Sequence, residues 1–177
     1  GEGYTSDVIP AIEFATTYRR ELKIDIINLS LGHPILEPAA NDPLVRAVER
    51  AAAAGLAVVV SAGNNGFNPK TGEIGYAGIS SPGNAPSAIT VGSLRTKKTA
   101  SREDDEVSKY SSRGPTWYDG FAKPDILAPG QALTAMSDAR SKLNADENLR
   151  AEIAPYLRLS GTSMAAAVGS GVVALVI

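Results

Sequence analysis

The fold is decided by residues 24–60, which read IDIINLSLGHPILEPAANDPLVRAVERAAAAGLAVVV. At the two ends of this stretch, residues 24–31 and 56–60 are mostly branched and apolar, as in strands buried on both faces of a parallel sheet. Between them, apolar residues recur at helical spacing, with an N-cap in the dipeptide before Pro43 and a helix-ending glycine at Gly55. Strand, crossover helix and strand form a βαβ unit, which predicts an α/β fold with a mainly parallel sheet.

Three more elements are expected outside this unit, in addition to the final apolar stretch described below. A first helix is predicted from an N-cap at Ser6 to about residue 22, and Pro10 is tolerated there because it falls in the first turn. Residues 88–94 predict a third strand. Residues 144–157 predict a short amphipathic surface helix.

The composition fits one globular domain and excludes several functions. The 177 residues are 44% hydrophobic, enough for a sizeable core. The net charge is -2 with both signs mixed along the chain, so neither nucleic acid nor a membrane is an expected partner. Cysteine is absent, which excludes disulfides and thiolate metal sites. The sequence shows no signal peptide, opens without Met and stops in an apolar stretch, so we expect a part of a larger domain.

A hydroxyl group stands directly before the uncharged final stretch. Ser160-Gly161-Thr162-Ser163 predicts a tight turn, and residues 164–177 predict a helix buried on all sides. This helix is too short and too rich in alanine and glycine for a membrane span, which needs roughly 20 strongly apolar residues. Helix N-termini carry free N–H groups and the positive end of the dipole, which suit a reaction that develops negative charge. The pattern alone leaves Ser163 either as an N-cap or as a nucleophile.

Three turns follow the predicted strands and are candidates for the site. They are Ser30-Leu31-Gly32, Ser61-Ala62-Gly63-Asn64 and Ser80-Ser81-Pro82-Gly83. Open parallel sheets bind ligands outside the carboxyl ends of their strands, where these turns are expected to meet. The small residues Gly32, Ala62 and Ser80 among them leave room for a sizeable apolar group.

The turn at Ser163 resembles a known protease motif. Gly161-Thr162-Ser163-Met164-Ala165-Ala166 is similar to the segment around the nucleophile of the subtilisin-like serine proteases, the subtilases. Five other segments resemble those of the family in the family's order: residues 27–32, 59–66, 81–92, 110–115 and 123–130. The match departs at Ala167, where proline is usual, and at Gly169, where a branched apolar residue is usual.

The resemblance implies a fold and a set of roles. The sheet should be flanked by helices on both faces and incomplete, with residues 1–177 forming a partial peptidase domain without its upstream part and its C-terminal end. Ser163 would be the nucleophile and Asn64 the oxyanion-hole donor. Taken alone, Asn64 would be interpreted as a left-handed turn residue beside Gly63 and Gly66, and the nearby Ser163 motif favours the donor role instead. The implied substrate-binding residues are Ser30, Leu31, Gly32, Ala62, Gly63, Asn65, Ser80, Ser81, Pro82, Gly83 and Thr162.

The general base is missing from this sequence. The one histidine, His33, lies in the segment that resembles the substrate-binding strand, so we expect a pocket-rim residue rather than a base. In the family, the catalytic Asp and His precede the segments matched here. Asp25, in a buried strand, and Asp125 are therefore interpreted as structural. The chain alone should not cleave peptides at the rate of a whole enzyme.

Two other classes of function are alternatives. A subtilisin-like domain without activity would keep the substrate strand for binding peptides. An unrelated α/β hydrolase or nucleotide-binding protein is disfavoured, because the sequence has neither Gly-x-Ser-x-Gly nor a Gly-rich phosphate loop.

Cofactor and partner expectations are few. No cofactor is predicted, and no metal ligand is assigned: a structural calcium ion at residues 103–106 is disfavoured, since consecutive acids point in different directions. The expected partners are a polypeptide substrate and the remaining part of the same domain. Exposed sheet edges would also favour self-association. Secretion is what the resemblance implies.

Overall fold

A five-stranded sheet forms the centre of the molecule. The computed structural model describes residues 3–138, 140–149, 151 and 155–177. Strands β1 (Ile26–Leu29), β2 (Ala57–Ser61), β3 (Ile89–Arg95) and β5 (Ile126–Pro129) are parallel neighbours, and β4 (Glu106–Val107) pairs antiparallel with β3. The predicted α/β fold with a mainly parallel sheet is confirmed.

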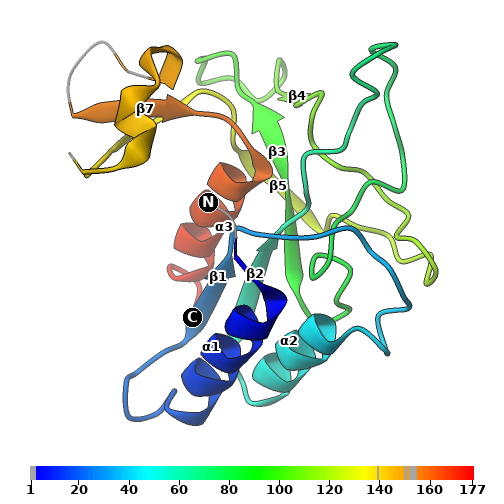
Figure 1. Ribbon diagram of the computed structural model, residues 1–177. Coiled ribbons are helices and arrows are strands. Elements are labelled where there is room, and N and C mark those ends of the chain that lie inside the picture. The colour runs from blue at the N-terminus through cyan, green and yellow to red at the C-terminus, as the bar shows by residue number, and fades with distance from the viewer. Residues whose placement is uncertain (1–2, 139, 150, 152–154) are drawn as a thin grey trace.

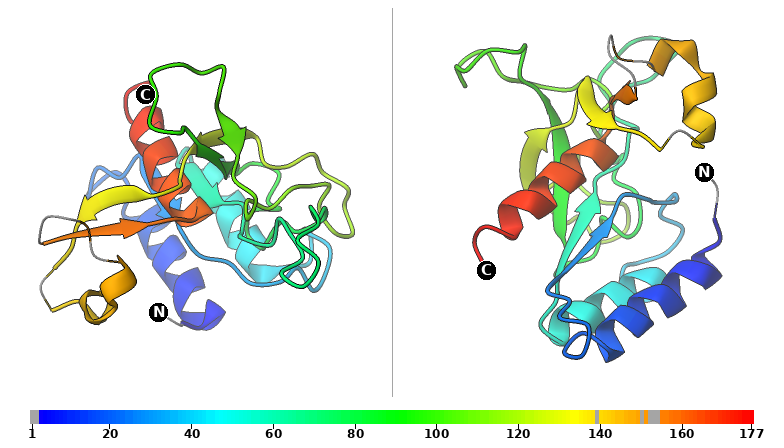
Figure 2. Two further views of the ribbon diagram at one scale, coloured as in Figure 1. Left: turned by 90° about the horizontal axis from the view of Figure 1, so that it is seen from above. Right: turned by 90° about the vertical axis from the view of Figure 1, so that its left-hand side faces the viewer.

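Helices cover both faces of this sheet, as predicted. Helices α1 (Thr5–Thr17) and α2 (Pro43–Ala53) lie side by side on one face, and α3 (Thr162–Val173) crosses the other (Figures 1 and 2). The core under α1 and α2 is rich in valine and leucine, whereas α3 meets the sheet through small residues. The N-terminus of α3 lies at the same end of the molecule as the carboxyl ends of β1 and β2 (Figure 1).

Helix α2 has the predicted boundaries because the residues expected to begin and end it do so in the structure. Asp42 is the N-cap: its Oδ1 accepts hydrogen bonds from the N–H groups of Leu44 and Val45, at 2.8 and 3.3 Å. Pro43 occupies the first helical position. Gly55 ends the helix with φ 95°, a left-handed conformation that glycine adopts without a Cβ penalty.

Loss of the Asp42 carboxylate is expected to lower the free energy of unfolding by about 2–3 kcal/mol. Asp42 is buried, and its Oδ2 accepts a 2.6 Å hydrogen bond from the buried Ser81 hydroxyl. Asp42→Ala therefore removes the helix cap and also leaves a buried hydroxyl without its acceptor. Denaturant unfolding of Asp42→Ala, Ser81→Ala and the double variant measures the coupling. If the losses of unfolding free energy in the two single variants add up in the double variant, the hydrogen bond between Ser81 and Asp42 does not couple the two residues.

Helix α3 packs closely against the sheet, but the prediction that it is buried on all sides was wrong. Ala165, Ala166 and Gly169 are buried, whereas Ala167 and Val172 are exposed. A Cβ at Gly169 would stand 3.2 Å from a methyl group of Val91, so a branched residue here would require Val91 to shift.

Several predicted boundaries were wrong at the N-terminal side of the sheet. Helix α1 begins after Tyr4, with no side-chain cap from Ser6, and ends at Thr17, so Pro10 lies within the helix rather than in its first turn. Strand β1 has four residues instead of eight. Asp25 precedes it and is exposed, so this residue does not lie in a buried strand.

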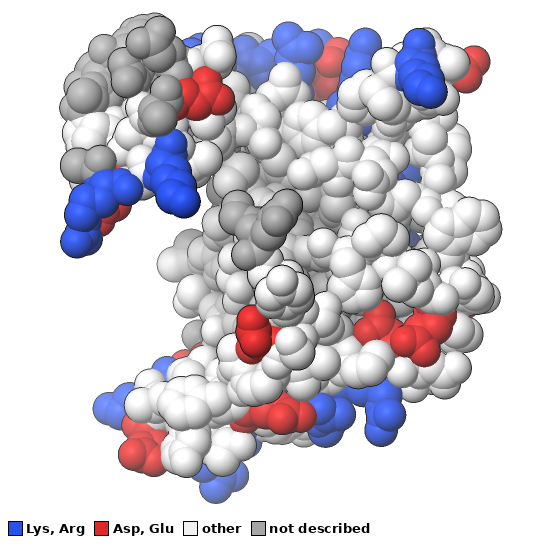
Figure 3. All heavy atoms as spheres, viewed as in Figure 1, with Lys and Arg blue, Asp and Glu red and all other residues white. Residues whose placement is uncertain are grey.

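A hairpin projects from the body near the start of α3. Strands β6 (Leu133–Met136) and β7 (Tyr156–Leu159) pair antiparallel. The amphipathic helix predicted at residues 144–157 is wrong: two short 3-10 turns, η1 (Lys142–Ala145) and η2 (Glu147–Leu149), precede β7, and residues 150 and 152–154 lie outside the described residues. In Figure 3 the hairpin region projects at the upper left, above an open recess in the surface of the molecule.

Candidate functional site

Ser163 is the second residue of α3 and faces the end of β1. Its Oγ donates a hydrogen bond to the Ser30 carbonyl at 3.3 Å, and the Ser30 Oγ donates to the Ser163 carbonyl at 2.9 Å. The N-cap of α3 is Gly161, which has no side chain, and the Ser163 hydroxyl bonds to Ser30 rather than to an N–H group of the helix. The capping interpretation of Ser163 is therefore wrong, which leaves a half-buried hydroxyl at the positive end of a helix dipole.

Asn64 lies beside Ser163 with its amide held in one orientation. Its Oδ1 accepts hydrogen bonds from the Thr162 N–H at 3.0 Å and from the Thr162 Oγ1 at 3.1 Å. Because the oxygen is held in this way, the Nδ2 group remains the donor end of the amide. The left-handed residue of this turn is Gly63, with φ 103°, and Asn64 has no positive φ. The conformation of Asn64 thus gives no support to its interpretation as a left-handed turn residue.

Thr162 lies behind Asn64. Its side chain is 1% exposed, and its Oγ1 also accepts a 3.1 Å hydrogen bond from the Gly63 N–H. Predicted as a substrate contact, Thr162 instead directs its side chain toward the amide that it orients. The sequence pattern had no signal for this role, because the contact joins residues 98 positions apart.

The three predicted turns do come together at the carboxyl ends of the strands. The Ser30–Gly32 segment continues into an antiparallel bridge between His33 and Ser81, with N–H to O distances of 3.0 and 2.9 Å. Ser80 in turn donates its N–H to the Ala62 carbonyl at 3.1 Å. The turns therefore form one connected wall next to Ser163 and Asn64.

Only some of the predicted substrate-binding residues reach the surface of this wall. Those with exposed or half-buried positions are Ser30, Leu31, Gly32, Gly63, Asn65 and Ser80. Ala62, Ser81, Pro82 and Gly83 are buried behind them. A Cβ at Gly63 would stand 2.6 Å from the Ser80 Oγ, and one at Gly32 would stand 2.9 Å from the Ser81 carbonyl oxygen. Glycine at these two positions lets the turns pack together.

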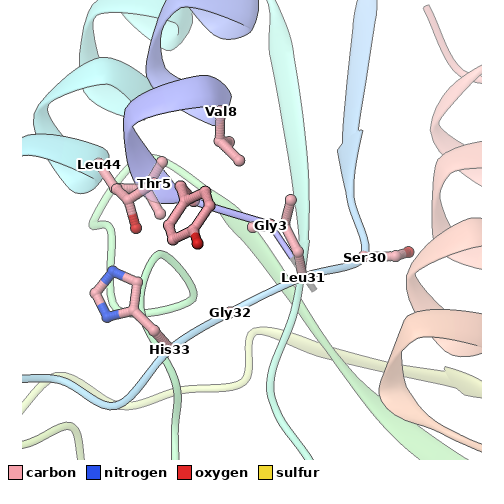
Figure 4. A pocket seen from close by; sticks show the side chains of 9 residues that line it. Gly3, Thr5, Val8, Ser30, Leu31, Gly32, His33 and Leu44 are labelled. Atoms are coloured by element: carbon pink, nitrogen blue, oxygen red, sulfur yellow. The ribbon is translucent and has the colours of Figure 1, made fainter. Parts of the chain in front are cut away.

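A cavity of about 550 Å³ opens beside the Ser30–Gly32 segment. Residues of α1 and α2 complete its lining, among them Thr5, Val8 and Leu44, and His33 borders it from the segment itself (Figure 4). Sequence reasoning assigned the apolar residues of α1 and α2 to helix faces and missed this cavity. His33, which was predicted at the rim of a substrate pocket, is one of the residues that line this cavity.

No base in reach of Ser163 is supplied by the residues considered from the sequence. The His33 Nδ1 lies 2.8 Å from the Pro34 carbonyl, and the ring faces the cavity while the Ser30 side chain points to α3 (Figure 4). Asp125 accepts hydrogen bonds from the Thr90 N–H and from the buried Lys123 ammonium, both at 2.7 Å. This pairing fits the structural interpretation of Asp125.

In the acidic run at residues 103–106, the side chains of Asp104, Asp105 and Glu106 make contacts within the protein. Asp104 accepts hydrogen bonds from Thr99, and Asp105 pairs with Arg102 at 3.3 Å. The Lys97 ammonium, hydrogen-bonded to Glu106, holds the pKa of that carboxyl below its ordinary value. Within the part of the chain that the structure describes, no three His, Cys, Asp or Glu side chains are grouped to hold a metal ion.

Charged side chains are unevenly distributed over the face of the molecule seen in Figure 3. On the face seen in Figure 3, Lys, Arg, Asp and Glu side chains gather along the upper and lower edges, and the band between them is largely uncharged. No helix among the described residues has both the length and the apolar character needed to cross a membrane.

Comparison with known proteins gives a consistent set of relatives. The profile of the Subtilase family matches residues 1–177. Serine protease AprX of Bacillus subtilis (strain 168) is 40% identical over 182 residues, which cover 100% of this chain and 39% of AprX. Subtilisin DY of Bacillus licheniformis is 29% identical over 177 residues, which cover 100% of this chain and 50% of the relative.

The solved structures agree with these sequences. Sphericase matches with a TM-score of 0.71 at 28% identity, and the match covers 98% of this chain and 49% of Sphericase. The S41 psychrophilic protease matches with a TM-score of 0.71 at 27% identity, covering 98% and 50% of the two chains. The chain therefore spans half or less of the length of these relatives.

Proposed function

The chain belongs to the subtilase family of serine proteases, and from this membership we propose that residues 1–177 are one part of a serine endopeptidase domain. The resemblance found in the motifs is thereby confirmed, and polypeptides are the class of substrate that the family implies. The observation that carries the proposal is the arrangement of Ser163 at the start of α3 beside an Asn64 amide oriented by Thr162.

The two groups have complementary parts in acyl transfer. The Ser163 Oγ attacks the carbonyl carbon of the scissile peptide bond and forms an acyl-enzyme, while its proton passes to a base and then to the leaving amine. The carbonyl oxygen becomes negative in the tetrahedral intermediate. The Asn64 Nδ2 and the Ser163 N–H, at the helix N-terminus, donate hydrogen bonds to it.

The connected wall is proposed to hold the substrate. The Ser30–Gly32 segment is exposed beyond β1 and offers backbone groups to an extended peptide, which would add to it as a strand. Asn65 and Ser80 lie at the surface of the same wall, with the Asn65 Nδ2 3.4 Å from the Ser80 Oγ. An uncharged wall favours apolar or neutral side chains over basic ones.

The base is proposed to come from the part of the domain outside this chain. Among the described residues β1 pairs only with β2, so its other edge is open. An apolar cavity of about 320 Å³ lies beside that edge, lined by residues of α1 and β1 such as Val8, Ile12 and Leu29. A further segment of the domain would pair with this edge and fill the cavity, and its absence would favour self-association instead. Secretion stays a prediction from the family resemblance.

The decisive experiment is active-site labelling of the protein with its complete domain. A fluorophosphonate is expected to attach to Ser163, as located by mass spectrometry, because only an activated hydroxyl reacts rapidly. The isolated residues 1–177 are expected to label slowly and to cleave peptides far more slowly than the complete domain. Absence of an adduct on the folded complete domain would favour the alternative, a subtilisin-like domain that binds peptides without cleaving them.

Removal of the Asn64 amide is expected to lower kcat by about 10²–10³-fold with little change in KM. This magnitude is the loss measured when a subtilisin was deprived of its oxyanion-hole asparagine. The reason is that the donor acts on charge present only in the transition state. Steady-state kinetics of Asn64→Ala test it, with Asn68→Ala as the matched control on an exposed loop. Equal kcat values for the two variants would show that Asn64 does not stabilise the oxyanion.

A further inference from the structure

Two pairs of polar residues meet where α3 crosses β1. Asn28 and Ser30 are two positions apart on the extended chain and so share one side of it. Ser163 and Ser170 are seven positions apart on α3, two helical turns, and so share one helix face. The Ser30 side chain points toward α3, away from the cavity beside Leu31 (Figure 4).

Both the oxygen and the nitrogen of the Asn28 side-chain amide make hydrogen bonds. Its Oδ1 lies 3.1 Å from the Ser170 Oγ, and its Nδ2 donates to the Ser30 Oγ at 3.0 Å. The Ser170 hydroxyl is also 2.9 Å from the Ala166 carbonyl, so its single proton serves one of the two acceptors at a time. The amide thus connects the middle of α3 to Ser30.

Ser30 links Asn28 to Ser163 through its hydroxyl group. Its Oγ accepts from Asn28 and donates to the Ser163 carbonyl at 2.9 Å, while its own carbonyl accepts from the Ser163 Oγ. Hydrogen-bond donation thus runs in one direction, from the Asn28 amide to the Ser30 hydroxyl and from there to the Ser163 carbonyl. The four residues Asn28, Ser30, Ser163 and Ser170 are called the α3–β1 relay below.

The rest of the α3 interface offers little that fixes the helix along its axis. Ala165, Ala166 and Gly169 pack on Val59 and Val91, and such apolar contacts are not directional. They hold the helix against the sheet but resist sliding or rotation weakly. The N-terminal end of α3 is held by the bonds of Thr162 with Asn64 and Gly63 and by the bond from the Gly161 N–H to the Gly130 carbonyl. Beyond this end, the relay supplies the directional contacts of α3 with the sheet in the described residues.

We propose that the α3–β1 relay positions the Ser163 hydroxyl for attack, and that Asn28 and Ser170 are positioning residues of the reaction. The proposal rests on the proposed function of Ser163. A displacement of about 1 Å at a reacting atom costs on the order of 10²-fold in rate, so even a partial shift of α3 affects catalysis. Asn28 and Ser170 themselves touch neither substrate nor the reacting atoms.

The test uses Asn28→Ala and Ser170→Ala in the protein with its complete domain. Each variant is expected to lower kcat roughly tenfold while KM stays within about twofold, because the substrate wall is intact. The rate of fluorophosphonate labelling at Ser163 is expected to fall by the same factor. Ser170→Thr keeps a hydroxyl at this position and is expected to restore kcat to within about twofold of the unchanged protein.

The control separates positioning from helix stability. Thr16 in α1 makes the same bond to the carbonyl four residues earlier, at 2.7 Å to Ile12, but has no part in the relay. Thr16→Ala is therefore expected to keep kcat while changing the unfolding midpoint about as much as Ser170→Ala. If the unchanged protein is active and both Asn28→Ala and Ser170→Ala keep its kcat and its labelling rate, the positioning role of the relay is wrong, whereas the proposed function of Ser163 stands. If the unchanged protein with its complete domain neither cleaves peptides nor is labelled at Ser163, both the proposed function and the positioning role of the relay are wrong.

Discussion

Replacement of Ser163 by alanine is expected to lower kcat for peptide cleavage by about 10⁶-fold in the protein with its complete domain. The magnitude is the one measured in a subtilisin whose nucleophile was removed. Without the hydroxyl no acyl-enzyme forms, so the oxyanion hole and substrate binding alone remain, worth about 10³–10⁴ over water. Burst kinetics with an activated ester and mass spectrometry of the acyl adduct measure the loss.

The neighbouring Ser160 gives a matched control for this experiment. Its Oγ accepts a 2.9 Å hydrogen bond from the Ala132 N–H at the base of the β6–β7 hairpin, in the same turn as Ser163. Ser160→Ala is expected to change kcat by less than about tenfold, because it removes one exposed hydrogen bond and no reacting group. A fluorophosphonate adduct that persists in Ser163→Ala would place the nucleophile at another residue.

The central unit of the fold was predictable because its signals are local. The branched run at 56–60, the Pro43 start and the Gly55 end each act within a few residues, and β2 and α2 lie where they predict. The edges of the sheet were less predictable. Residues 24–31 look like a buried strand, but β1 stops at Leu29 because the following segment turns to pair with Ser81.

The candidate site shows the same division between local and distant contacts. Ser163 and Asn64 were found from short motifs, which depend on neighbouring residues. The roles proposed for Thr162, Asn28 and Ser170 depend on hydrogen bonds between residues about 100 to 140 positions apart, which no periodicity reveals. The burial of Ser81 is of this kind too, since its partner is the N-cap of α2.

Gly66→Ala is expected to lower the free energy of unfolding by on the order of 4 kcal/mol, or to prevent folding. A Cβ at Gly66 would stand 2.0 Å from the Ser111 carbonyl oxygen and 2.6 Å from that of Lys109. Both obstacles are backbone atoms, which cannot turn aside as the end of a side chain can. The segment is also tied down, since the Gly66 N–H donates to Tyr110 at 2.9 Å and its carbonyl accepts from Arg113 at 3.2 Å.

Gly72→Ala separates this crowding from the general cost of replacing a loop glycine. Gly72 lies in the same loop with φ 74°, but nothing stands within 4 Å of its added Cβ, so only the left-handed backbone opposes alanine, at about 1 kcal/mol. Thermal unfolding should therefore shift by about 8–16 °C for Gly66→Ala and by about 2–4 °C for Gly72→Ala. Because Asn64 lies two residues before Gly66, a backbone shift there should also move the oxyanion donor and lower kcat in molecules that still fold. Equal shifts of the unfolding temperature in the two variants would mean that the loop accommodates the Cβ of Gly66→Ala without the expected loss of stability.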